Sequence, residues 1–211
     1  MDAVARAGAG AFGVNRQEPI TGVVLAGGQG RRMGSVDKGL VTLAGKPMIA
    51  HVLERFAPQV DQVLINVNRS LDAYAAFGHR LVKDGVGGYA GPLAGLQAAL
   101  GAAMHPLVAT VPCDSPFLPR DLVARLHAAM VSRQAQLAVA RTFDQPHPVF
   151  ALVRRDVHAH LTSFLDAGGR KIDAWYSTLA TVEVAFDDEA DAFRNINTAE
   201  ELAAAVPGCP S

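Results

Sequence analysis

The sequence has 211 residues, of which 50% are hydrophobic and 18% are charged, and its formal net charge is −1. This length and apolar content predict one domain with one substantial core. The near-neutral charge gives no global attraction for nucleic acid, so an affinity for phosphate has to come from local cations. No apolar run approaches the length of a membrane span, and two cysteines form neither a disulfide framework nor a zinc pattern. We therefore expect a cytoplasmic protein that binds neither nucleic acid nor membranes.

The predicted domain covers residues 19–206. Residues 1–18 are rich in alanine and glycine and lack the continuous apolar core of a signal peptide, so they are predicted to form a disordered arm. Residues 207–211 are predicted to form a flexible tail.

Strands and helices are predicted to alternate along this domain. Strands or short extended segments are predicted at 20–25, 39–43, 63–68, 80–83, 107–111, 136–141, 148–153 and 181–186. The uniform apolarity of residues 20–25 suits a strand that is buried on both faces of a parallel sheet. Helices are predicted at 47–56, 71–77, 93–103, 119–133, 155–165 and 171–179, and a capping box at 198–201 starts a last one. This alternation predicts an α/β fold with a three-layer, doubly wound, mostly parallel sheet.

The first predicted strand runs directly into a loop of glycines and cations. Its glycines let backbone N–H groups approach an anion, and Arg32 and Lys38 add positive charge beside it. The loop is not a dinucleotide fingerprint, because Met33 stands where the third glycine belongs. It is not a P-loop either, because the only Gly-Lys pair is followed by Pro47. The alternative is a glycine-rich surface turn with solvated arginines.

Polar residues also follow three other predicted strands. Ligands of an open parallel sheet bind outside the carboxyl ends of its strands. There Asp114 suits Mg²⁺, which one or two carboxylates hold together with substrate phosphates, although it could instead cap a helix. Asp84 could be a second metal contact, an acceptor for base or ribose donors, or a plain turn residue. Asn66 could bind a nucleobase or a ribose hydroxyl, or only terminate its strand.

Several short motifs resemble one enzyme family in the same order along the chain. They are Leu25-Ala26-Gly27-Gly28, Arg32-Met33-Gly34, Asp37-Lys38, Ala44-Gly45-Lys46-Pro47-Met48, Asn66-Val67-Asn68-Arg69, Asp84, Gly91-Pro92-Leu93-Ala94-Gly95, Pro112-Cys113-Asp114-Ser115-Pro116, His147-Pro148 and Asn195-Ile196-Asn197-Thr198. Over residues 20–205 the chain is similar to nucleotidyltransferases with a glycosyltransferase-A-like fold, also described as nucleotide-diphospho-sugar transferase-like. It looks closest to the molybdenum cofactor guanylyltransferases.

The resemblance implies transfer of GMP from MgGTP to the terminal phosphate of molybdenum-bound molybdopterin, with release of pyrophosphate. It implies catalytic roles for Arg32, Lys38 and Asp114, with Asp114 on magnesium. The residues implied to bind GTP are Leu25, Ala26, Gly27, Gly28, Lys38, Asn66, Asp84 and Asp114. Those implied to lie toward molybdopterin are Gly91, Pro92, Gly95, Asn195 and Asn197. The expected partners beyond these substrates are molybdenum cofactor biosynthesis proteins and target apoenzymes, in transient contact.

Two rival functions stay open. Molybdopterin cytidylyltransferases resemble this chain but typically carry Leu-Ala-Ala-Gly where it has Leu-Ala-Gly-Gly, so the extra glycine favours the larger guanine. A non-catalytic nucleotide-binding partner is the other rival. The presence of Arg32, Lys38 and Asp114 argues against it, because a protein without activity would be free to lose them.

Overall fold

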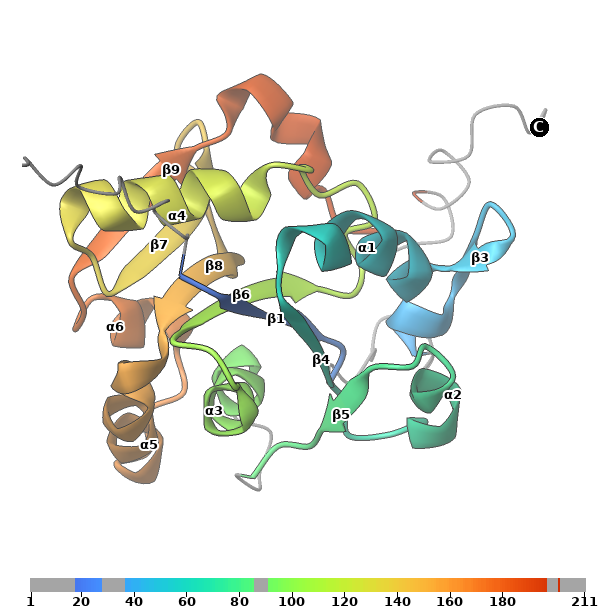
Figure 1. The fold of residues 1–211 in the computed structure, drawn as a ribbon, viewed down its shortest axis with the longest axis horizontal. Helices are drawn as coiled ribbons and strands as arrows, with labels where there is room; N and C mark the ends of the chain where they lie inside the picture. The colour runs from blue at the N-terminus through green and yellow to red at the C-terminus, as the bar shows by residue number, and fades with distance from the viewer. Residues whose placement is uncertain (1–17, 28–36, 86–90, 197–200, 202–211) are drawn as a thin grey trace, which may run out of the picture.

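The computed structural model describes residues 18–27, 37–85, 91–196 and 201 (Figure 1). Its centre is a seven-stranded sheet with the order β5-β4-β1-β6-β8-β7-β9. The strands are β1 (Ile20–Leu25), β4 (Gln62–Asn66), β5 (Arg80–Val82), β6 (Leu107–Pro112), β7 (Leu137–Thr142), β8 (Gln145–Arg154) and β9 (Thr181–Ala185). All neighbouring strands are parallel except at β8, which is antiparallel to both β6 and β7. The predicted mostly parallel sheet is confirmed.

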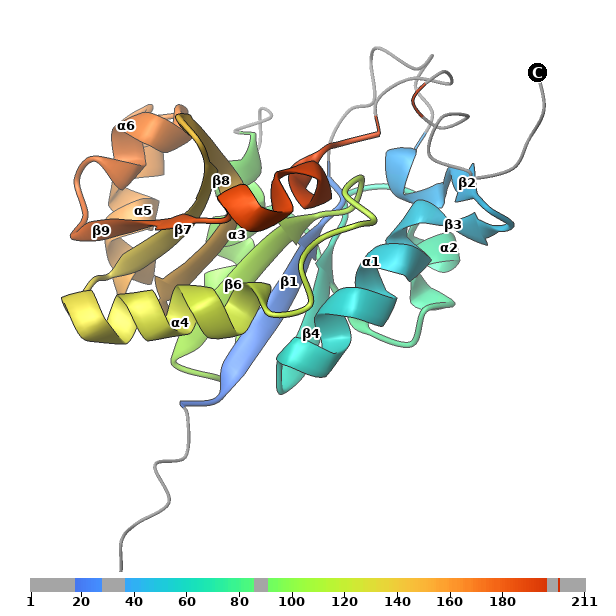
Figure 2. The same cartoon turned by 90° about the horizontal axis from the view of Figure 1, so that it is seen from above.

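Helices cover both faces of this sheet. They are α1 (Met48–Phe56), α2 (Leu71–Ala75), α3 (Pro92–Ala102), α4 (Leu122–Arg133), α5 (His158–Asp166) and α6 (Ile172–Tyr176). Figures 1 and 2 show α1 and α4 on one face, and α3 and α5 on the other. A separate antiparallel ribbon pairs β2 (Thr42–Leu43) with β3 (Lys46–Pro47).

The alternation of side chains along the central strands builds two cores. Successive strand residues point to opposite faces, so Val24 packs with α1 and α4, whereas Val23 packs with α3 and α5. Both valines are fully buried. The three-layer architecture is therefore the consequence of β1 being apolar on both faces.

The hairpin between β7 and β8 differs from the sequence-based expectation. We predicted this strand only from residue 148, with residues 144–147 as the connection from the preceding strand. The observed β8 begins at Gln145, and its first residues pair with β7 alone, since β6 pairs only with residues 151–154. One side of this stretch is an edge, where proline is tolerated.

A second difference is a 3-10 helix, η5 (Asp187–Phe193), that the sequence analysis did not assign. This acidic segment lacks the repeating apolar residues that would predict a helix. The buried rings of Phe186 and Phe193 hold its two ends. In Figure 2 it lies at the edge of the sheet where β1 and β6 end.

Some predictions fall outside the described residues. These are the arm before Glu18, the tail at 207–211 and the capping box apart from Glu201. In the part of the chain that the structure describes, no helix has both the length and the apolar character needed to cross a membrane.

Candidate functional site

The carboxyl edge of the sheet brings together a lysine and an aspartate that are 76 positions apart in the sequence. Lys38 lies on a short 3-10 helix, η2 (Lys38–Leu40), and Asp114 lies two residues beyond the end of β6. Lys38 Nζ donates to Asp114 Oδ2 at 3.2 Å, and the two side chains are only 24% and 13% exposed. The structure thus joins two of the predicted catalytic residues in one partly buried ion pair.

Asp37 extends this pair towards α2. Its carboxylate accepts a hydrogen bond from the hydroxyl of Tyr74, and its other oxygen, Oδ2, lies 3.9 Å from Arg69 Nε. Burial and the bond to Asp37 raise the pKa of Tyr74, so this phenol stays protonated and acts as a donor. Asp37 was part of a recognised motif, but the sequence analysis gave neither it nor Tyr74 a role. The available signal was its place directly before Lys38 in the sequence: Asp37 is the N-cap residue of η2, and its carbonyl accepts a hydrogen bond from the Leu40 N–H at 3.0 Å.

A network of amides surrounds Asp84. Asn66 Nδ2 donates to Asp84 Oδ1 at 2.8 Å, and Asn68 Nδ2 donates to Asp84 Oδ2 at 2.8 Å. The backbone N–H of Asp84 in turn donates to Asn68 Oδ1 at 3.0 Å. Because both carboxylate oxygens accept amide protons, this geometry favours a role for Asp84 in orienting amides over a role as a second metal contact.

Two glycines border the Asn66 amide at close range. A Cβ atom on Gly95 would lie 2.3 Å from Asn66 Oδ1, and one on Gly27 would lie 3.2 Å from the same oxygen and 2.9 Å from Asn68 Nδ2. A side chain at either position would therefore displace the network. Gly95 was predicted to lie toward the second substrate, and the structure places it against Asn66, which was predicted on the GTP side.

Asn195 lies on the other side of Asp114. Its Oδ1 accepts a hydrogen bond of 2.6 Å from the hydroxyl of fully buried Ser115, and the backbone N–H of Ile196 donates to the carbonyl of Asp114 at 2.9 Å. These bonds fasten the segment after η5 to the end of β6. They bring Asn195 against Ser115, the residue that follows Asp114, and its predicted place toward the second substrate stays a prediction.

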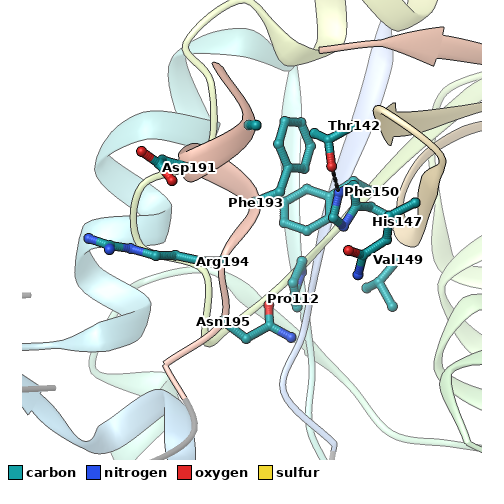
Figure 3. A pocket seen from close by; sticks show the side chains of 11 residues that line it. Pro112, Thr142, His147, Val149, Phe150, Asp191, Phe193, Arg194 and Asn195 are labelled. Carbon is teal, nitrogen blue, oxygen red and sulfur yellow. Dashed lines mark hydrogen bonds between the residues drawn. The ribbon is translucent and has the colours of Figure 1, made fainter. Parts of the chain in front are cut away.

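A hollow of about 430 Å³ opens beside Asn195 (Figure 3). The residues that line it come from β6, the β7–β8 hairpin and η5 with its following segment: Pro112, Thr142, Gln145, His147, Val149, Phe150, Ala190, Asp191, Phe193, Arg194 and Asn195. Burial lowers the pKa of His147, and its Nε2 lies 2.7 Å from Thr142 Oγ1. The sequence analysis gave His147 no role, and only its position in the hairpin places it at the site.

The structure describes some of the remaining predicted residues and not others. Leu25 ends β1, and the N–H of the following Ala26 donates to the Asn66 carbonyl at 2.8 Å. Gly91 and Pro92 begin α3. Gly28, Arg32 and Asn197 lie outside the described residues.

The residues present fit a magnesium ion that is held largely by substrate. Within the described ranges, no three His, Cys, Asp or Glu side chains gather closely enough to form a protein-only metal site. Asp114 offers a hard carboxylate at the phosphate-facing edge, and Asp37 Oδ2 is buried with no hydrogen-bond partner among the described residues. Mg²⁺ commonly takes one or two carboxylates and completes its shell with phosphates and water.

Comparison with known proteins identifies the family. Residues 22–182 match the family described as the MobA-like NTP transferase domain. The chain belongs to the MobA-like NTP transferase family. Proteins named molybdenum cofactor guanylyltransferase from Burkholderia ambifaria and Ralstonia nicotianae are each 50% identical to it, over 88% and 87% of this chain and 94% of each relative.

Solved structures of MobA-like proteins share the fold. Molybdopterin-guanine dinucleotide biosynthesis protein A from Archaeoglobus fulgidus superposes with a TM-score of 0.72 at 27% sequence identity, and the match covers 88% of this chain and 96% of that one. The family and the fold that the sequence motifs predicted are both confirmed.

Proposed function

We propose that this chain transfers GMP from GTP to the terminal phosphate of molybdenum-bound molybdopterin and releases pyrophosphate. The observation that carries the proposal is the Lys38–Asp114 pair, which lies between an amide network and a ring-lined hollow. A cation and a carboxylate at this position suit a triphosphate and its metal, and the hollow beside Asn195 offers room for a second substrate. The names of the relatives at 50% identity support the choice of substrates.

In this proposal the nucleotide lies on the β4–β5 side of the site. Asn66 and the backbone of residues 25–27 contact the nucleoside, and Asp84 keeps the two asparagine amides in a fixed orientation. Lys38, together with Arg32, neutralises the triphosphate. The carboxylate of Asp114 would hold a magnesium ion, which when bound supplies further positive charge to the phosphates.

The chemistry needs no protein nucleophile. A phosphate monoester has a second pKa of about 6, so the acceptor is already an anion near neutral pH. The oxygen of this phosphate attacks the α-phosphorus of GTP, and the bond to pyrophosphate breaks. The protein positions the two anions and stabilises the developing charge. Cys113, the nearest thiol in sequence to Asp114, is buried, and burial raises its pKa, so it stays protonated.

Gly27 supports guanine over cytosine in this proposal. An alanine there, as in the rival cytidylyltransferases, would force its Cβ against the Asn66 and Asn68 amides. The glycine thus permits the arrangement of amides that would face the base. We also infer transient contacts with proteins that deliver or receive the cofactor, and a reaction in the cytoplasm, both on the strength of the family resemblance.

The test is a transfer assay with purified protein, GTP, magnesium and molybdenum-bound molybdopterin. We expect pyrophosphate release only when both substrates are present, and a product with the mass of the guanine dinucleotide form. Release of pyrophosphate from GTP alone, with no dinucleotide formed, would refute guanylyl transfer.

A further inference from the structure

The hydroxyl of Tyr74 lies beside the turn that carries Lys38. Tyr74 belongs to α2, and its side chain is fully buried in the core on the α1 side of the sheet. The hydroxyl donates a hydrogen bond to Asp37 Oδ1, 37 positions away in the sequence. A Cβ atom on Gly39 would lie 2.5 Å from the same hydroxyl oxygen, so the backbone at Gly39 packs closely against it. The hydroxyl therefore lies against the residues on both sides of Lys38.

Asp37 directs its carboxylate to Tyr74 instead of to its own helical turn. An aspartate at the N-cap commonly accepts a hydrogen bond from a backbone N–H of the first turn. Within the described residues, the Asp37 side chain makes no such capping bond to η2. The side chain is only 11% exposed, and its second oxygen lies 3.9 Å from Arg69 Nε. The start of η2 is therefore held from α2 and the residue before it, and not by local capping.

The same cluster connects η2 with the segment after β6. A Cβ atom on Gly39 would lie 3.3 Å from the Cβ of Cys113, so these two residues are packed together. Their chain neighbours, Lys38 and Asp114, form the ion pair of 3.2 Å. A small displacement of a positioning group can remove much of its effect on a bound substrate. The place of η2 against Cys113 therefore decides where the ammonium group of Lys38 can act.

We propose that Tyr74 is a positioning residue for the nucleotide: through its hydrogen bond with Asp37, it holds η2 where Lys38 faces the phosphates. This inference rests on the proposed function for the role of Lys38. Because Tyr74 is fully buried, it contacts no substrate and acts on the phosphates only through the turn. The alternative is a purely structural role, in which the hydrogen bond stabilises the fold and has no effect on Lys38.

A double-mutant cycle distinguishes positioning from a structural role. The full chain is titrated with GTP and magnesium, and dissociation constants are compared for wild type, Tyr74→Phe, Lys38→Met and the double variant. Tyr74→Phe removes only the hydroxyl and keeps the ring in the core. We expect it to weaken GTP binding about tenfold in the wild-type chain, which corresponds to the loss of one hydrogen bond to a charged group. In the Lys38→Met background the same change should weaken GTP binding less than about twofold, because the group that Tyr74 positions is absent.

Tyr176→Phe is the matched control. Tyr176 is also buried, and its hydroxyl donates to the Pro148 carbonyl of β8 at 2.7 Å. The same oxygen is lost from a buried ring, so the dissociation constant for GTP should stay within about twofold of wild type. Urea denaturation shows whether each variant folds. If Tyr74→Phe does not fold, Asp37→Ala replaces it in the cycle with the same expected values, because it removes the acceptor of the same hydrogen bond and leaves the buried ring in place.

Three results would overturn the role of Tyr74. They are wild-type GTP affinity in Tyr74→Phe, an equal loss of affinity in Tyr176→Phe, and a loss in the Lys38→Met background as large as in the wild-type chain. The last would show that the hydroxyl acts independently of Lys38. If wild type binds CTP in place of GTP, the proposed function fails, and the same cycle measured with CTP still decides the role of Tyr74. A wild-type protein that binds no nucleoside triphosphate would refute both.

Discussion

Lys38 Nζ lies 3.2 Å from Asp114 Oδ2, across 76 positions of sequence and between the two halves of the site. The pair joins the η2 turn to the end of β6. Each side chain therefore holds the other where a triphosphate and its metal would bind. When substrates bind, Lys38 and Asp114 exchange their mutual contact for contacts with the phosphates and the metal.

Replacing the carboxylate tests this arrangement most simply. Asp114→Asn keeps the shape of the side chain and removes its charge, so we expect kcat to fall at least about 100-fold with the fold intact. Pyrophosphate release at saturating GTP, magnesium and molybdenum-bound molybdopterin measures the effect. Asp156→Asn is the control, because Asp156 pairs with Arg154 on the surface, outside the site. Wild-type turnover by Asp114→Asn would remove this carboxylate from the mechanism.

Gly95 should prove essential for nucleotide binding. The methyl group of Gly95→Ala would lie 2.3 Å from Asn66 Oδ1, so the Asn66 amide has to move out of its bond with Asp84. We expect KM for GTP to rise about tenfold, the loss of roughly one or two hydrogen bonds. Gly101→Ala in the same helix is the control, since its Cβ would meet only the end of His158 at 3.4 Å. Equal KM values for the two variants would argue against the amide network as a nucleotide site.

Arg125 should stabilise η5 and with it one wall of the hollow. Its guanidinium lies 3.9 Å from the centroid of Phe186, donates to the Ala185 carbonyl at 2.5 Å and pairs with Asp188 at 2.9 Å. Arg125→Met should lower the free energy of unfolding by about 1–2 kcal/mol, measured by urea denaturation, mainly through the lost stacking and the unpaired carbonyl.

The matched variant is Arg154→Met, which breaks only an exposed ion pair with Asp156. Such pairs contribute less than about 1 kcal/mol, so its stability should stay near that of wild type. If Arg125→Met and Arg154→Met lower the free energy of unfolding equally, the stacking of Arg125 on Phe186 contributes nothing to stability.

His147 should make stability depend on pH. Because burial lowers its pKa in the folded protein, the unfolded chain takes up a proton first as the pH falls below about 6.5. The free energy of unfolding should therefore decrease between pH 7 and pH 5. In His147→Gln the decrease should be smaller, which urea denaturation at pH 7, 6 and 5 would measure. If the free energy of unfolding falls equally with pH in wild type and His147→Gln, the pKa of His147 is the same in the folded and unfolded protein.

The sequence predicted the parts of the fold in which local pattern and tertiary packing agree. β1 and β6 are uniformly apolar because both faces are covered, and their bounds were found almost to the residue. The early start of β8 could not be predicted, because Pro146 and Pro148 are tolerated only through the absence of a second neighbour there. η5 was missed because its anchors also pack on residues of other elements: Phe193 contacts Phe150 of β8, and Phe186 lies under Arg125 of α4.

The candidate site shows the same division. Asp114, Asn66 and Asp84 were found because they follow apolar strands, and strand ends of a parallel sheet meet at one edge. The contact between Gly95 and Asn66 depends on how closely α3 approaches the sheet, which no local pattern reveals. The hollow likewise needs the antiparallel β8, which brings His147 at the start of that strand to the edge where the parallel strands end.

The most direct test of the central claim compares the four nucleoside triphosphates as donors to molybdenum-bound molybdopterin, with magnesium and the wild-type protein. The account predicts that kcat/KM for GTP exceeds that for CTP by at least about 100-fold, and that the product is the guanine dinucleotide form. A preference for CTP, or equal use of both nucleotides, would contradict the assignment of this site to guanylyl transfer.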